Sequence, residues 1–178
     1  MKKLIIAGIA AGIACTSLSA MAATSGEGQV NFTGEIIESA CQVVNGLSSP
    51  LDVSLGKVAK SAFTGTGSTA ATTRFDISLK NCPETVTGAS ITFGGTPDSG
   101  NNDVLAVTSG TGTATGVGIQ LLDKSETPLS LYSASASYAL QSGTTVNDLQ
   151  FGARYIQTNA TISAGLANAV STFTVVYN

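Results

Sequence analysis

The sequence predicts an all-β protein folded as a two-layer sandwich, and three observations support that prediction. Apolar and polar residues alternate over five separate short stretches, which is the pattern of strands that bury one face. Beyond the first 22 residues, no long stretch places apolar residues at helical spacing. Ser, Thr, Gly, Ala and Val dominate the composition, and residues typical of turns separate the alternating stretches.

The five alternating stretches define the predicted strands. Turn residues lie between them, at 45–46, 65–67, Pro83 and Pro128, and a polar loop is expected over 97–103. Several short strands at this spacing favour a single sandwich domain of immunoglobulin-like type. The apolar positions of the five stretches are Leu51, Val53 and Leu55; Phe75, Ile77 and Leu79; Val117, Ile119 and Leu121; Leu149, Phe151 and Ala153; Phe173, Val175 and Tyr177.

Residues 1–22 are predicted to be a cleaved export signal. A basic pair at 2–3 precedes an apolar run over 4–14, which is too short to span a bilayer. Small residues follow, and 20–22 read Ala-Met-Ala, the pattern that a signal peptidase cuts. The mature chain is then expected to begin near Ala23 with about 156 residues, enough for one domain with its own core.

The cysteines predict a disulfide. Lipoprotein processing at Cys15 is the alternative to signal cleavage, although Gly12 stands where such sites usually carry Leu. If Cys15 leaves with the signal, Cys41 and Cys82 remain, and an even pair in an exported chain indicates a bridge. In the chain-entropy model a bridge over this separation contributes roughly 4 kcal/mol to stability.

Charge and residue types argue against several classes of function. Removing the signal leaves six basic and eleven acidic residues, a net charge of −5, which does not suit nucleic acid or an anionic membrane. The sequence has no His, which removes Ser-His-Asp and Cys-His catalysis and most zinc sites. Asp98 and Asp103 lack the spacing of a calcium site and are interpreted as solvated loop residues. We therefore expect no enzyme activity, metal or cofactor.

The first segment of the mature chain is predicted to be extended, with one apolar side and one polar side. Gly28, Val30 and Phe32 fall on one side of an extended segment, and polar residues fall on the other. Taken by itself, this segment is better interpreted as the frayed start of a first strand.

The last predicted strand changes that interpretation. Phe173, Val175 and Tyr177 alternate up to the final residues, so this strand needs a hydrogen-bonded neighbour on each side. If nothing in the chain pairs with one of its edges, a free extended segment from another chain can add to it.

Several segments together carry a family resemblance. In chain order they are 28–35, Cys41, 53–58, Cys82, 116–123, 151–155, Gly165 (fourteenth from the C-terminus) and Tyr177 (next to last). With these segments in this order, the chain resembles the major subunits of type 1-like fimbriae, which the chaperone–usher pathway assembles. The resemblance covers essentially the whole mature chain.

The resemblance implies an incomplete immunoglobulin-like sandwich of six strands that lacks its last strand. It implies a donor-strand extension over 23–34 and a pilin domain over 35–178. A periplasmic chaperone fills the gap first, and at the outer-membrane usher the extension of the next subunit replaces the chaperone. Identical subunits then polymerise into an extracellular fimbrium that carries tip or adaptor subunits and supports cell adhesion.

The resemblance also assigns residues to the two sides of this contact. Gly28, Val30 and Phe32 are expected to enter the neighbour's groove, and the carboxylate of Asn178 is expected to anchor to basic residues of the chaperone. Gly26 and Thr24 stand where related donors often carry a further apolar residue, so the outermost donor position stays open. The residues expected at the acceptor groove and chaperone-binding strand are Gly165, Phe173, Val175, Tyr177 and Asn178.

Two other functions share parts of this pattern. A minor adaptor subunit of a fimbria has the same sandwich and the same extension. A free-standing periplasmic binding domain differs because it folds without a partner. A tip adhesin is disfavoured, because it would need an additional receptor-binding domain and would lack the extension.

Overall fold

A computed structural model describes residues 29–34, 36 and 40–178 of the chain. The predicted export signal lies outside the described residues. The chain divides into two compact units, residues 1–36 and 37–178, and the second contains every described strand. The described elements are β1 (Gln42–Val43), the 3₁₀ helix η1 (Lys60–Ala62), β2 (Thr73–Lys80), β3 (Gly88–Gly95), β4 (Pro97–Asp98), β5 (Asn101–Ala106), β6 (Val117–Leu122), β7 (Pro128–Leu129), β8 (Tyr138–Ala139), β9 (Asn147–Gln157) and β10 (Ser171–Tyr177).

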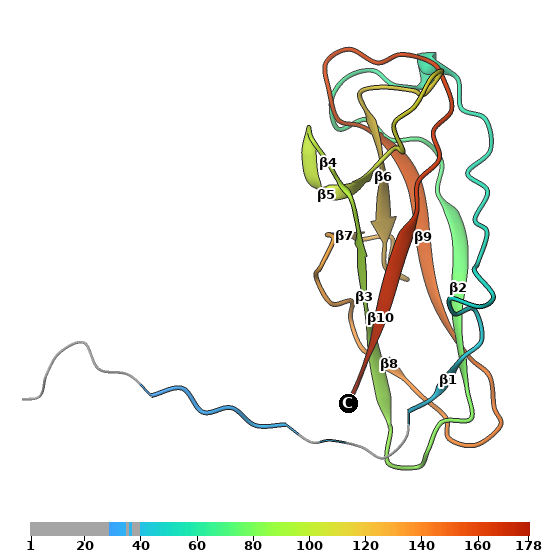
Figure 1. Cartoon of the computed structure of the whole chain (residues 1–178), viewed down its shortest axis with the longest axis vertical. Helices are drawn as coiled ribbons and strands as arrows, with labels where there is room; N and C mark the ends of the chain where they lie inside the picture. Colours follow the sequence, from blue (N-terminus) through green and yellow to red (C-terminus); the bar gives the residue numbers. More distant parts are fainter. Residues whose placement is uncertain (1–28, 35, 37–39) are drawn as a thin grey trace, which may run out of the picture. The chain divides into compact units, whose positions relative to one another are not determined.

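The strands form two antiparallel sheets that face each other as a sandwich (Figure 1). The large sheet has the order β1-β2-β9-β6-β5-β4, with β7 beside β6. The small sheet has the order β10-β3-β8. Six of the described strands contain six or more residues, namely β2, β3, β5, β6, β9 and β10, and the other four are two-residue segments. The predicted all-β sandwich with six principal strands is therefore confirmed.

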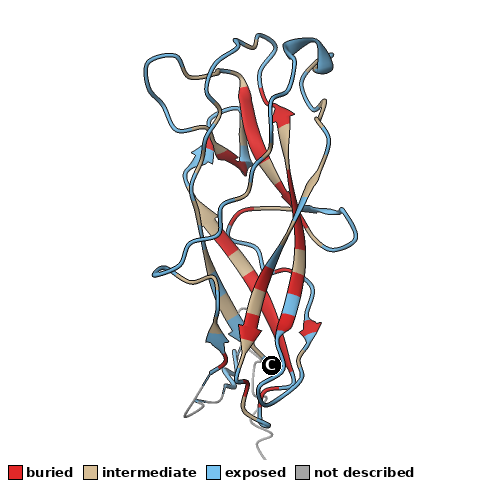
Figure 2. Ribbon diagram, turned by 90° about the vertical axis from the view of Figure 1, so that its right-hand side faces the viewer, coloured by how far each residue is buried: buried red, intermediate tan, exposed pale blue. Residues whose placement is uncertain are grey.

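The register of the large sheet explains why the predicted alternation points inward. Phe75 pairs with Phe151 and Ile77 with Leu149 across β2 and β9, so their side chains share one face. Their polar neighbours, such as Asp76, face outward. Figure 2 shows strands with buried and less buried positions in succession, as β2 has them, whereas β6 is buried along almost its whole length.

Aromatic rings join the two sheets at the centre of the core. The ring centroids of Phe93 on β3 and Phe151 on β9 lie 5.1 Å apart in an edge-to-face arrangement. Phe75 contacts both rings, at 6.2 and 6.0 Å. Tyr138 reaches Phe151 from β8 at 5.4 Å. Edge-to-face aromatic pairs add about 0.5–1.5 kcal/mol beyond the area they bury, so this cluster ties the small sheet to the large one.

The predicted disulfide between Cys41 and Cys82 is present and buried. It joins the residue before β1 to the turn that follows β2. The amide of Asn147 reaches the Cys82 sulfur at 3.7 Å, which ties the start of β9 to the same end of the sandwich.

Three segments differ from what the sequence predicts. The stretch with Leu51, Val53 and Leu55 does not form a strand, because Gly56 adopts a left-handed backbone (φ 70°) and no described strand pairs with the stretch. The expected loop over 97–103 is instead the hairpin of β4 and β5. Strand β3 was missed, because its inward positions include Ala89 and Gly95 and its apolar alternation is weak.

Replacing Phe151 with Ala should lower the free energy of unfolding by about 3–5 kcal/mol, because it removes a fully buried ring shared by both sheets. Phe151→Leu is the control and should lower the free energy of unfolding by less, since most of the side-chain volume is retained. Urea denaturation of the three chains under identical conditions gives the comparison. A loss below about 1 kcal/mol for the Ala variant would contradict the central role of this ring.

Candidate functional site

The most unusual feature of the second unit is the edge of β10. All seven residues of β10 pair with β3, from Ser171 opposite Gly95 to Tyr177 opposite Ala89. Among residues 40–178, no strand pairs with the other edge of β10. The N–H and C=O groups that point to that edge are therefore available to an added strand.

The inward side chains of β10 are only half covered. Phe173, Val175 and Tyr177 pack against the core but remain partly exposed, whereas Ile91 and Phe93 on the adjacent β3 are buried. The Phe173 ring lies 6.4 Å from the Phe93 ring, and its side chain stays partly exposed. In a complete sandwich, the inward side chains of a strand are covered by the opposite sheet and by the strands at both of its edges. The incomplete burial of these three side chains therefore indicates that a neighbouring strand is missing beside β10.

A second unpaired segment lies on the β2 side of the sandwich (Figure 1). Residues 50–58 make no backbone hydrogen bond to any other residue in the described part of the unit. Leu51 is 43% exposed, and Val53 and Leu55 are half-buried, with Leu55 packed against the core. The alternation of this segment is visible in the sequence, but its place beside the groove was missed.

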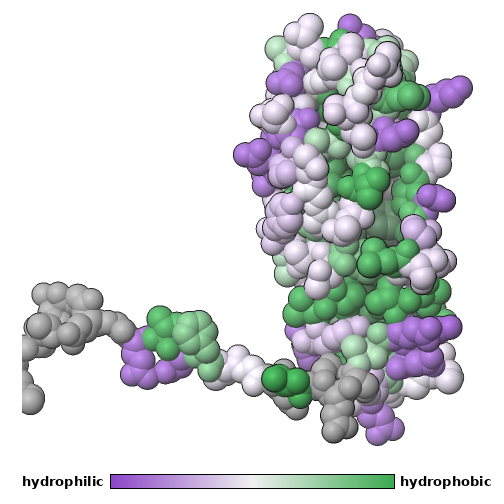
Figure 3. Space-filling model, viewed as in Figure 1, coloured by the Kyte–Doolittle hydropathy of each residue, from purple (hydrophilic) through white to green (hydrophobic). Residues whose placement is uncertain are grey.

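An apolar groove separates β10 from residues 50–58. Figure 3 shows hydrophobic side chains gathered in a hollowed strip along this side of the unit. Phe75 on β2 and Tyr155 on β9 are likewise partly exposed apolar residues that pack on the core. The groove therefore offers apolar side-chain contacts with an unpaired backbone segment on either side, which is the geometry that accepts a β-strand.

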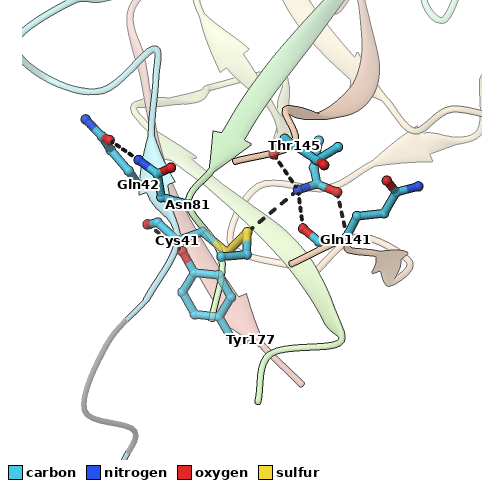
Figure 4. The surroundings of a disulfide bond; sticks show 8 residues. Cys41, Gln42, Asn81, Gln141, Thr145 and Tyr177 are labelled. Atoms are coloured by element: carbon cyan, nitrogen blue, oxygen red, sulfur yellow. Dashed lines mark hydrogen bonds between the residues drawn. A yellow bond between two sulfur atoms is a disulfide. The ribbon is translucent and has the colours of Figure 1, made fainter. Parts of the chain in front are cut away.

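Tyr177 and the disulfide hold one end of β10 (Figure 4). The Tyr177 hydroxyl donates to the carbonyl oxygen of Cys41 at 3.3 Å, directly beside the Cys41–Cys82 bridge. The backbone N–H of Asn178 donates to the Gly88 carbonyl at 2.8 Å, which extends the pairing with β3 by one residue. The end of β10 is thus fixed to the covalent link between β1 and β2.

Gly165 lies outside β10. It stands six residues before β10, in an exposed segment next to Leu166, which bridges to Thr113. A side chain at this position would meet the backbone of residues 112–114 within 2.5 Å. The close approach of two backbone segments explains why Gly occupies the position, and its expected role in the groove stays a prediction.

The other described segment is extended and exposes its apolar side chains. Val30 is 73% exposed, Phe32 is 92% exposed and Ile36 is 99% exposed. The Gln29 amide donates to the Asn31 side-chain oxygen at 2.6 Å, so these two polar side chains share a side. Gly28 lies outside the described residues. Val30 and Phe32 are therefore exposed in this segment, and the side that they share stays a prediction of the alternation.

No group of three possible metal ligands occurs among the described residues. Asp98, which was expected to be solvated, is instead buried, and its carboxylate accepts the Gly100 N–H at 2.9 Å within the β4–β5 turn. Arg154 lies on β9, where its Nε donates to Gln120 on β6. In the described part of the chain, no helix is long and apolar enough to cross a membrane.

Comparison with known proteins shows the family of this chain. The family model described as fimbrial protein matches residues 30–178. The chain belongs to the fimbrial protein family. It is 39% identical to a probable major fimbrial subunit of Escherichia coli O157:H7, over 99% of this chain and 97% of the relative. It is 38% identical to the A chain of the type-1 fimbrial protein of Escherichia coli K12, over 94% and 93% of the two chains.

Solved structures of fimbrial proteins share the fold. A type I fimbria protein of Burkholderia pseudomallei is 41% identical and superposes with a TM-score of 0.60, covering 83% of this chain and 96% of that one. The P pilus rod subunit PapA superposes with a TM-score of 0.63 at 21% identity, covering 79% and 100% of the two chains, and this likeness concerns the fold alone. The fold is therefore the immunoglobulin-like sandwich of fimbrial subunits, and the chain is a structural fimbrial protein.

Burial of tyrosines near the groove predicts how stability depends on pH. Burial raises the pKa of Tyr177 and of Tyr155 above the ordinary value of 10.0. The unfolded chain then loses these protons at lower pH than the folded chain, so the stabilising contribution is present below pH 10 and is lost as the pH rises toward the raised values. Tyr177→Phe should weaken this alkaline loss, as measured by urea unfolding at pH 9 and at pH 11. An unchanged difference between the two pH values would contradict the prediction.

Proposed function

We propose that this chain is the repeating subunit of a chaperone–usher fimbria, in which the groove beside β10 receives the N-terminal segment of the next subunit. The unpaired edge of β10 is the observation that carries the proposal, because it leaves the sandwich, as far as the structure describes it, without one strand. The extension comprises residues 23–34 and the groove belongs to the domain at 35–178.

The proposed contact combines side-chain burial with backbone pairing. Val30 and Phe32 enter the groove, where each contributes on the order of 1.5–3 kcal/mol when fully buried. The backbone between them pairs with β10 on one side and with residues 50–58 on the other. Each new hydrogen bond contributes about 1 kcal/mol net. Backbone pairing along both edges therefore adds to the free energy gained by burying the two apolar side chains.

Gly28 continues the same side of the donor segment beyond Val30. A residue without a side chain suits a shallow part of the groove, where a larger group would clash. The donor then approaches the groove wall closely at this point. Phe32 and Val30 supply the apolar anchors, and Gly28 supplies the close backbone contact.

Assembly requires partners that protect the groove before polymerisation. A periplasmic chaperone that lends a strand to β10 would cover Phe173, Val175 and Tyr177, and basic chaperone residues would bind the carboxylate of Asn178. An outer-membrane usher then exchanges that strand for residues 23–34 of the next copy. The fibre grows outside the cell and carries tip or adaptor subunits.

A repeating structural role is favoured over the other functions. The relative from Escherichia coli O157:H7 is described as a probable major subunit, which supports a repeating subunit over a minor adaptor. The half-covered groove argues against a free-standing periplasmic domain, which would need a complete core. We assign the chain no enzymatic activity and no cofactor, since its sequence contains no His and its family is structural.

Residues 34–178 produced alone should be unstable or aggregate, because the groove and the β10 edge remain uncovered. Adding a peptide of residues 23–36 should raise the melting temperature sharply. A peptide with Val30→Ser and Phe32→Ser is the matched control and should have little effect. If the truncated chain already unfolds cooperatively and the native peptide changes nothing, the donor-strand proposal fails.

Replacing Phe32 with Asp should stop fibre growth, because a charge would have to enter the apolar groove of the next subunit. Chaperone capture should persist, since it uses β10 rather than the extension. Asn31→Asp adds the same charge on the opposite side of the segment and should still give fibres. Electron microscopy of cells that carry the chaperone and usher reads the result, and normal fibres from the Phe32 variant would contradict the assigned side.

A further inference from the structure

Tyr155 reaches from the large sheet to the segment that leads into β10. It lies on β9 opposite Ile119 of β6, and its side chain packs on the core while remaining partly exposed. Its hydroxyl donates to the backbone carbonyl of Ala167 at 3.0 Å. Ala167 belongs to neither sheet, because β10 begins only at Ser171. The bond therefore joins the large sheet to the backbone just ahead of the unpaired strand.

Hydrogen bonds, rather than burial, hold this segment in place. The N–H of Leu166 donates to the Gly112 carbonyl at 2.8 Å, and the N–H of Thr108 donates to the Asn168 carbonyl at 2.8 Å. These partners belong to the connection between β5 and β6. The apolar side chains at both ends of the segment contribute little, since Leu166 is 65% exposed and Val170 is 79% exposed.

Tyr177 makes the corresponding bond at the other end of β10. Its hydroxyl donates to the carbonyl of Cys41, the residue before β1 of the large sheet. Ser171, at the start of β10, bonds instead to Gly94 within the small sheet. Among residues 40–178, no other side chain of β10 hydrogen-bonds to the large sheet. A tyrosine hydroxyl thus ties the backbone to the large sheet at each end of the strand.

The missing strand gives these two bonds a particular role. In a complete sandwich, β10 would be paired along both edges, and that pairing would order its ends. Here the second edge has no partner among residues 40–178, so the ends of β10 open more easily than those of a fully paired strand. A donor strand must order an open end as it binds, which weakens binding. A hydrogen bond that orders the end beforehand removes this free-energy cost.

We propose that Tyr155 is a positioning residue for strand acceptance, whose hydroxyl orders the start of β10 while the groove is empty, as the hydroxyl of Tyr177 orders the end. The inference rests on the proposed function, because it assumes a donor strand from another copy. Without the Tyr155 hydroxyl, the empty chain can relax by opening the segment around Ala167. The filled groove still needs that segment in place, so the donor has to order it on binding.

Tyr138 offers a matched control, because it makes the same kind of bond elsewhere. It lies on β8, and its hydroxyl donates to the carbonyl of Gln150 on β9 at 2.5 Å, so it also joins the two sheets. Strand β8 lies at the opposite edge of the small sheet from β10. Tyr138→Phe and Tyr155→Phe each remove one hydroxyl and keep the ring, but only Tyr155→Phe releases the segment ahead of β10.

Peptide binding separates a positioning role from a general effect on stability. The mature chain, residues 23–178, is refolded with increasing amounts of a fluorescent peptide of residues 23–36, and anisotropy gives the peptide concentration at half-saturation. Tyr155→Phe should raise this concentration by about three- to tenfold, and Tyr138→Phe should leave it within about twofold of the wild type. Urea unfolding of the peptide-bound chains should show a loss of stability for both variants.

The outcomes distinguish the inference from the proposed function. Equal half-saturation for Tyr155→Phe and the wild type would overturn the positioning role. An equal rise for Tyr138→Phe would overturn it too, because a general loss of stability would then explain both variants. A wild-type chain that binds no peptide would instead contradict the proposed function, and the inference with it.

Discussion

Backbone hydrogen bonding along one edge of β10 is the constraint on which the rest of the structure depends. The strand is held by β3 on one side, and on the other side no strand among residues 40–178 satisfies its N–H and C=O groups. The same gap leaves Phe173 and Val175 only half covered. An unpaired edge beside an apolar strip is a hazard for a free protein, but it is the feature that lets a fibre subunit receive a strand from its neighbour.

The rest of the sandwich keeps that gap in one shape. The aromatic cluster around Phe151 joins the two sheets, and the Cys41–Cys82 bridge ties β1 to the end of β2. The hydrogen bond from Tyr177 to Cys41 then fixes the end of β10 to that bridge. A strand whose end is held in this way needs less ordering when a partner binds.

Sequence patterns were reliable where one face of a strand is strongly apolar. The alternation around Phe75, Ile119, Phe151 and Phe173 identified β2, β6, β9 and β10, and the cysteine count predicted the bridge. The same pattern failed at residues 51–55, which alternate but lack a partner strand within the described unit. It also failed for β3, whose small inward residues are buried by the opposite sheet and carry little apolar signal of their own.

The sequence by itself determined the class of fold, the export signal as a prediction, the disulfide and the two-sided character of the segment with Val30 and Phe32. Each of these depends on local spacing or residue type, which the chain carries before it folds. Only the tertiary structure decided that residues 50–58 and β10 border one groove, that Gly165 packs on residues 112–114, and that the Tyr155 hydroxyl reaches the Ala167 carbonyl. These features arise from which distant segments meet, and strand pairing between distant segments has no local signature.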